Sequence, residues 1–108
     1  MSQEAYIVAG YRTAVGKAKK GGFRFMHPVD LAKEVIDKLL ESVPDLDPVR
    51  VDDVIVGNAV PEAEQGLQMA RWVAVRALPK EVPGVTVNRY CGSGVETVAM
   101  ATAKIRAG

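Results

Sequence analysis

The fold follows from the stretch Val85-Thr86-Val87-Asn88-Arg89-Tyr90-Cys91-Gly92-Ser93-Gly94, in which an apolar run gives way to small residues. Residues 85–87 are typical of a short buried strand, and the small residues that follow predict a helix from Gly94 to Ala107. Cys91 is the only cysteine of the chain and lies between the two. The partial positive charge at a helix N-terminus favours the thiolate form, so Cys91 is a candidate nucleophile.

A lone cysteine is more often a small hydrophobic residue inside a core. The neighbours of Cys91 favour the other interpretation, because Gly92 and Gly94 permit a sharp turn and the close approach of a substrate. The sequence therefore predicts a reactive thiol at a strand-to-helix turn.

Two further apolar runs precede this stretch, at residues 6–9 and 54–56, and each ends at a glycine. A segment with helical spacing follows each run, the first from about Asp30 and the second from Met69 to Leu78. Parallel strands joined by helices require right-handed crossovers. The sequence thus predicts an α/β fold of βαβαβα order, with a parallel sheet flanked by helices.

The first helix has the strongest pattern of the chain. Pro28 suits a first helical turn, and Glu34 with Lys38 forms an i,i+4 pair in the favourable order. Its apolar stripe consists of Leu31, Ala32, Val35, Ile36, Leu39 and Leu40. The last helix is rich in alanine on most sides, which predicts close packing on more than one face.

Three polar or small residues follow the three expected strands: Gly10, Asn58 and Cys91. In parallel sheets, ligands bind beyond the carboxyl ends of the strands. The expected topology therefore places a binding site at the same edge as Cys91.

Composition bounds the possible partners. The 14 basic and 13 acidic residues leave a net charge of +1, which predicts neither a nucleic-acid nor a membrane partner. No signal peptide and no membrane-spanning apolar run is evident, and a single cysteine suits a reducing cytoplasm. With 48% hydrophobic residues, residues 1–108 are expected to form one domain of cytoplasmic location.

Other candidate sites are weaker. His27 is the only histidine and stands next to Pro28, where a capping or surface role is expected rather than that of a base for Cys91. One cysteine and one histidine give no zinc site. Lys17, Lys19 and Lys20 are interpreted as a solvated loop.

The Cys91 segment closely resembles the nucleophile segment of thiolases, the acetyl-CoA acyltransferases. The similarity runs over essentially the whole chain, with Ala14 departing from the proline that many thiolases have. The other landmarks that agree in order and spacing are Arg12-Thr13 with Gly16-Lys17, Val56-Gly57-Asn58, and Gln65-Gly66 with Ala70-Arg71.

This resemblance implies that Cys91 carries an acyl group between CoA thioesters, in 3-ketoacyl-CoA thiolysis or acetoacetyl-CoA formation. Acyl-CoA and CoA would be substrates, with no tightly bound cofactor, and the complete protein would be a homodimer or homotetramer. Thiolases are several times longer, and their catalytic histidines and second cysteine lie beyond the matched region. The chain is therefore expected to be part of the N-terminal thiolase domain, with an incomplete sheet and no base for Cys91.

Other functions remain open. One is a non-catalytic fragment that acts as an assembly or regulatory partner of a thiolase. A ketoacyl-synthase-like condensing enzyme shares the architecture, although its nucleophile segment is less similar. A redox-sensing thiol would need a resolving cysteine, which this chain lacks.

Overall fold

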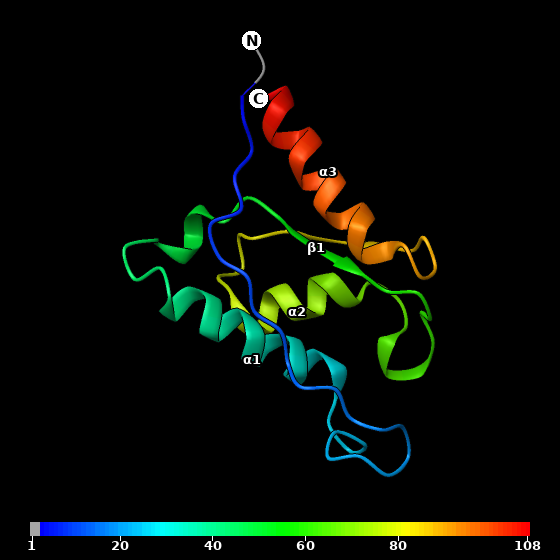
Figure 1. The fold of residues 1–108 in the computed structure, drawn as a ribbon. Helices are drawn as coiled ribbons and strands as arrows, with labels where there is room; N and C mark the ends of the chain where they lie inside the picture. Colours follow the sequence, from blue (N-terminus) through cyan, green and yellow to red (C-terminus); the bar gives the residue numbers. More distant parts are fainter. Residues whose placement is uncertain (1–2) are drawn as a thin grey trace.

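Two strands and three α-helices form the main regular structure of residues 3–108, the part of the chain that this computed structural model describes (Figure 1). A short 3₁₀ turn precedes the first strand and another precedes the second helix. In chain order the elements are α1 (Pro28–Glu41), η1 (Pro48–Arg50), β1 (Val54–Gly57), η2 (Ala63–Gln65), α2 (Met69–Ala77), β2 (Gly84–Val87) and α3 (Ser93–Ala107).

The two strands pair in parallel, in a register that runs from Val54 opposite Gly84 to Gly57 opposite Val87. The ladder continues one residue further, because the Asn58 N–H donates to the Val87 carbonyl at 2.9 Å. A helix after each strand and α1 before them give the expected α/β class, with helices flanking a small parallel sheet (Figure 1).

The predicted strand at residues 6–9 is wrong. This segment is extended but forms no strand, and its apolar side chains face outward, with Ile7 87% exposed. Figure 1 shows it running past α1 and alongside α3 without joining the sheet. The physical reason is that a strand needs backbone partners, and β1 is hydrogen-bonded only to β2 among the described residues.

Helix α1 begins where the sequence predicts. Pro28 is its first residue, and His27 is the N-cap, whose Nδ1 accepts a hydrogen bond from the Val29 N–H at 3.2 Å. The expected capping role of His27 is confirmed. The expected Glu34–Lys38 pair is wrong. The Lys38 Nζ lies 3.0 Å from the Glu41 Oε2 instead, so Lys38 pairs with the residue three positions after it. This contact raises the pKa of Lys38 above its ordinary value.

The buried core joins α1 to α2. Val29 packs with Met69 and Val73, and Ala32 and Ile36 cover this cluster from α1. At the helix surface the Arg76 Nη2 lies 2.7 Å from Asp30 Oδ1 and ties the two helices together. The hydrogen bond from Arg76 holds the pKa of Asp30 below its ordinary value.

Helix α2 lies very close to β2. A Cβ on Gly84 would stand 2.7 Å from the backbone carbonyl of Ala70, so only glycine permits this approach. The Ala70 N–H in turn donates to Thr86 Oγ1 at 3.0 Å, which supplies a partner for the start of the helix.

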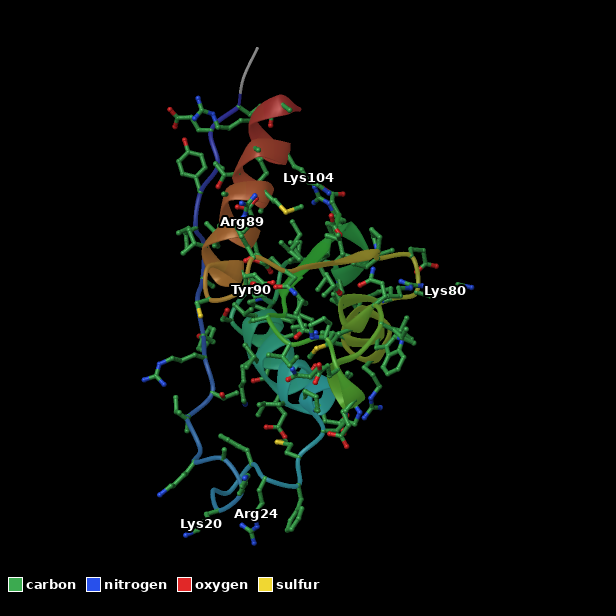
Figure 2. The ribbon with its side chains drawn as sticks, turned by 90° about the vertical axis from the view of Figure 1, so that its right-hand side faces the viewer. Lys20, Arg24, Lys80, Arg89, Tyr90 and Lys104 are labelled. Carbon is green, nitrogen blue, oxygen red and sulfur yellow. The ribbon has the colours of Figure 1, made fainter. Side chains whose placement is uncertain are left out.

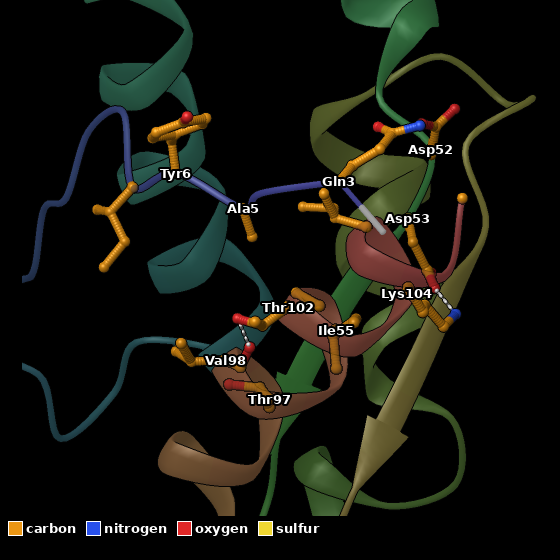
Figure 3. A pocket seen from close by; sticks show the side chains of 14 residues that line it. Gln3, Ala5, Tyr6, Asp52, Asp53, Ile55, Thr97, Val98, Thr102 and Lys104 are labelled. Carbon is orange, nitrogen blue, oxygen red and sulfur yellow. Dashed lines mark hydrogen bonds and ion pairs between the residues drawn. The ribbon is translucent and has the colours of Figure 1, made fainter. Parts of the chain in front are cut away.

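Helix α3 is less covered than predicted. Ser93 is its only buried residue, and Val95, Val98 and Ile105 are exposed. A cavity of about 1010 Å³ lies between α3, the residues before β1 and the N-terminal segment, where Lys104 pairs with Asp53 at 2.6 Å (Figure 3). The expected packing of α3 on more than one face is therefore wrong for residues 3–108. None of the described helices is long and apolar enough to cross a membrane.

Candidate active site

The turn between β2 and α3 has an unusual backbone. Asn88 Oδ1 accepts a hydrogen bond from the Tyr90 N–H at 2.9 Å, which closes a local Asx turn. Tyr90 then adopts a φ of 48°, in the left-handed region that side chains other than glycine rarely occupy. The chain reverses at Tyr90 and presents Cys91 directly before Gly92, the N-cap of α3.

Ser93 holds this turn from inside. Its Oγ accepts a hydrogen bond from the Arg89 N–H at 2.9 Å and donates to the Tyr90 carbonyl at 2.7 Å. The residue is only 5% exposed. Its role was missed in the sequence, although a serine at the start of a predicted helix is a known signal for local capping hydrogen bonds.

The end of β1 supports Ser93. A Cβ on Gly57 would stand 2.9 Å from the Ser93 Cβ and 3.0 Å from its carbonyl carbon. No side chain fits at Gly57 without moving the first residue of α3. The carboxyl end of one strand therefore fixes the start of the helix that follows the other.

An ion pair spans the outside of the turn. Arg89 Nε lies 3.0 Å from Glu96 Oε2, between the end of β2 and the first turn of α3. Figure 2 shows Arg89 and Tyr90 beside α3, and Lys20 and Arg24 at the far end of the molecule. The basic loop is thus not part of this turn.

Cys91 is exposed at the tip of the turn. It does not line the cavity beside α3. The first turn of α3 leaves the N–H groups of Gly94 and Val95 without an acceptor inside the helix, because their acceptors four residues earlier lie outside it. The thiol therefore precedes a helix start with backbone donors, as the sequence predicts.

The other residues expected at this edge differ from Cys91. Asn58 is 5% exposed, and its Nδ2 donates to the Gln65 carbonyl at 2.7 Å, so it secures the loop after β1. Gly10 lies in the exposed N-terminal segment and follows no strand, so its expected place at the sheet edge is wrong. His27 caps α1. Within residues 3–108, no three potential metal ligands come together.

Comparison with known proteins decides the family. The family model described as the N-terminal domain of thiolase matches residues 5–108. The chain belongs to the thiolase family. The expected thiolase family is confirmed, and so is the expected α/β class.

Named relatives of this thiolase chain agree. It is 48% identical over 107 residues to a 3-ketoacyl-CoA thiolase of Bacillus subtilis. The aligned region covers 98% of this chain and 27% of the Bacillus protein. It is 44% identical over 103 residues to the peroxisomal 3-ketoacyl-CoA thiolase 5 of Arabidopsis thaliana. The aligned region covers 94% of this chain and 22% of the Arabidopsis protein. A steroid 3-ketoacyl-CoA thiolase of Mycobacterium tuberculosis is 42% identical over 107 residues. The aligned region covers 97% of this chain and 26% of the Mycobacterium protein. The chain spans about a quarter of the length of these relatives.

Proposed function

We propose that Cys91 is the acyl-accepting nucleophile of an acyltransferase that acts on CoA thioesters. The observation that carries the proposal is the position of Cys91, exposed at a strained turn and directly before the N-cap of α3. The free N–H groups of Gly94 and Val95 would stabilise negative charge that develops on a carbonyl oxygen nearby.

The proposed step is a thioester exchange. The Cys91 thiolate attacks the carbonyl carbon of an acyl-CoA, a bond forms between that carbon and the Cys91 Sγ, and the bond to the CoA sulfur breaks. CoA leaves as a thiolate, so the negative charge passes from one sulfur to the other and nothing is oxidised. A second acceptor then removes the acyl group from Cys91, which makes the reaction a two-step transfer.

The relatives suggest the substrate class. All three are named as 3-ketoacyl-CoA thiolases. We therefore propose 3-ketoacyl-CoA thiolysis, as in β-oxidation, or the reverse condensation of two acetyl-CoA molecules to acetoacetyl-CoA. In thiolysis the Cys91 thiolate attacks the 3-keto carbon, the C2–C3 bond breaks, and acetyl-CoA leaves as a carbanion that takes up a proton from a donor outside residues 3–108. CoA then removes the acyl group from Cys91. CoA and acyl-CoA are the proposed partners of a cytoplasmic homodimer or homotetramer. The base for the second step is proposed to come from outside residues 3–108, because the only histidine of the chain caps α1.

Intact mass spectrometry tests the nucleophile. The full-length gene product is incubated with acetyl-CoA or a 3-ketoacyl-CoA, and we expect a mass gain of one acyl group on Cys91. The Cys91→Ala variant should give no adduct. A wild-type protein without an adduct, or an adduct that survives in Cys91→Ala, would exclude this function.

The exposed apolar side chains of α3 favour a second candidate, a non-catalytic partner of a thiolase subunit. In that case the protein would form a stable complex with a complete thiolase and take up no acyl group itself. Co-purification followed by the same mass measurement separates the two functions, since only the first predicts an adduct on Cys91.

A further inference from the structure

We propose that Ser93 is a positioning residue, whose hydroxyl holds Cys91 in the geometry needed for acyl transfer. This inference rests on the proposed role of Cys91. It adds a residue that touches no substrate and acts only through the backbone of the two residues that precede the nucleophile.

The first support is the hydrogen-bond geometry. Cys91 lies between Tyr90 and Gly92. The Ser93 hydroxyl contacts the two residues that precede Cys91, which are Arg89 and Tyr90. It accepts from the Arg89 N–H at 2.9 Å and donates to the Tyr90 carbonyl at 2.7 Å. One oxygen atom therefore closes a ring of backbone around the cysteine, with an optimal distance for each bond.

The second support is confinement. Ser93 is 5% exposed, so water does not readily replace its hydroxyl, and Gly57 packs against its Cβ and backbone. Loss of the hydroxyl would leave the Arg89 N–H without its acceptor in a poorly hydrated place. The turn would then have a reason to rearrange, and Cys91 would move with it.

The third support is the backbone of Tyr90. Its φ of 48° is unfavourable for a tyrosine and persists only where neighbouring contacts impose it. The Ser93 hydroxyl bonds the carbonyl of this same residue. Without that bond, Tyr90 would relax toward the right-handed region and turn Cys91 away from the start of α3.

Thr97 offers a matched control in the same helix. Its Oγ1 donates to the Gly94 carbonyl at 2.7 Å, which repeats the three-residue spacing of the bond from Ser93 to Tyr90. Thr97 lines the cavity beside α3 (Figure 3), and it lies about one helical turn beyond Ser93. Thr97→Ala removes the same type of hydrogen bond and leaves the Cys91 turn intact.

The experiment compares wild type, Ser93→Ala and Thr97→Ala in the full-length gene product. Three quantities are measured: the rate of acylation by acetyl-CoA, the KM for acetyl-CoA, and the rate of Cys91 alkylation by iodoacetamide. Circular dichroism shows whether each variant is folded. Iodoacetamide is a small reagent that reacts from many directions, so it reports access to the thiol and not its alignment.

For Ser93→Ala we expect acylation to fall by about 10- to 100-fold, because small misplacements of reacting groups have effects of this size. KM and the alkylation rate should stay within about threefold of wild type, since binding and access are unchanged. Thr97→Ala should acylate within about twofold of wild type, as expected for a site outside the reacting geometry.

Each alternative outcome is decisive. A folded Ser93→Ala protein that acylates as fast as wild type overturns the inference, and so does an equal loss in Thr97→Ala. A Ser93→Ala protein that is unfolded, or whose alkylation rate changes as much as its acylation rate, assigns Ser93 to folding and not to positioning. Absence of an adduct in wild type rejects the proposed function itself, which is a different result.

Discussion

Gly57 constrains the Cys91 turn from the neighbouring strand. Gly57→Ala places a Cβ 2.9 Å from the Ser93 Cβ, where the contacting atoms are backbone or close to it and have little freedom to move. We expect a loss of about 1–3 kcal/mol in the free energy of unfolding, typical of overpacking. Urea denaturation of wild type and variant, each as the full-length gene product, measures this difference.

Gly94→Ala is the matched control, because a Cβ at Gly94 meets nothing within 4 Å. Gly94 lies in the first turn of α3, and alanine is favoured over glycine in helices by up to about 1 kcal/mol. The same measurement should therefore show equal or higher stability. A Gly57→Ala protein as stable as Gly94→Ala would contradict the close packing of β1 on α3.

At the residue scale the sequence predicts where Cys91 lies, between a strand and a helix, but not which residues support its turn. Cys91 is identifiable because local signals meet there: a single thiol, flanking glycines and a change of hydrophobic period. Gly57 and Ser93 could not be paired in the same way, because they are 36 positions apart and only the parallel pairing of β1 with β2 brings them together. The support of the site therefore depends on tertiary structure that no local pattern contains.

Between elements, the Asp30–Arg76 pair is the exposed link from α1 to α2. Asp30→Asn should lower the melting temperature at pH 7 by no more than about 5 °C, because exposed ion pairs are weak. Asp45→Asn serves as the control, since Asp45 is exposed and forms no ion pair within residues 3–108. Differential scanning calorimetry of the three full-length gene products measures this shift.

The effect of Asp30 should depend on pH. Its folded pKa is lowered, chiefly by the hydrogen bond from Arg76, so the folded state binds this proton less tightly than the unfolded state. The stabilisation by ionised Asp30 is complete when the pH is above the pKa of this carboxyl in the unfolded chain, about 3.9. It is lost as the pH falls through the lower pKa of the folded state. The difference between wild type and Asp30→Asn should therefore disappear in strong acid, and a difference that stays constant would contradict this assignment.

Helices were more predictable than strands. The spacing that predicts α1, α2 and α3 is local, and their observed bounds lie within about one or two residues of the expected ones, the usual uncertainty of helix ends. Residues 6–9 have the composition of a strand, but composition does not reveal whether a partner edge is joined. The wrong prediction of a Glu34–Lys38 pair has a similar origin. Glu34 lies four positions before Lys38 and Glu41 three positions after it, both spacings allow an ion pair on a helix, and the observed Lys38 side chain reaches Glu41.

The whole chain exposes more surface than a compact protein of its size. Its accessible area is 7982 Å² for 11.6 kDa. A compact monomer of that mass exposes about 5,800 Å². The radius of gyration is 14.5 Å, against about 13 Å expected for a compact chain of this length. Large apolar side chains are exposed in the N-terminal segment, such as Ile7 and Val8, and along α3, such as Val95 and Val98.

Residues 1–108 expressed alone should therefore associate. We expect sedimentation velocity to show species larger than a monomer that increase with protein concentration, because exposed apolar patches favour contact. Thermal unfolding should be broad, since the buried core is confined to a few residues of α1 and α2 and a neighbouring loop. A monodisperse monomer with a sharp cooperative transition would contradict this expectation.

The exposed Cys91 gives two chains another way to join. It is the only cysteine of residues 1–108, so when these residues are expressed alone, oxidation in air leads to a disulfide between molecules. Such a dimer would persist on a non-reducing gel and vanish with dithiothreitol. An acyl group on Cys91 would block this disulfide, so residues 1–108 that carry an acyl group on Cys91 should run as single chains on the non-reducing gel after storage, while untreated protein cross-links.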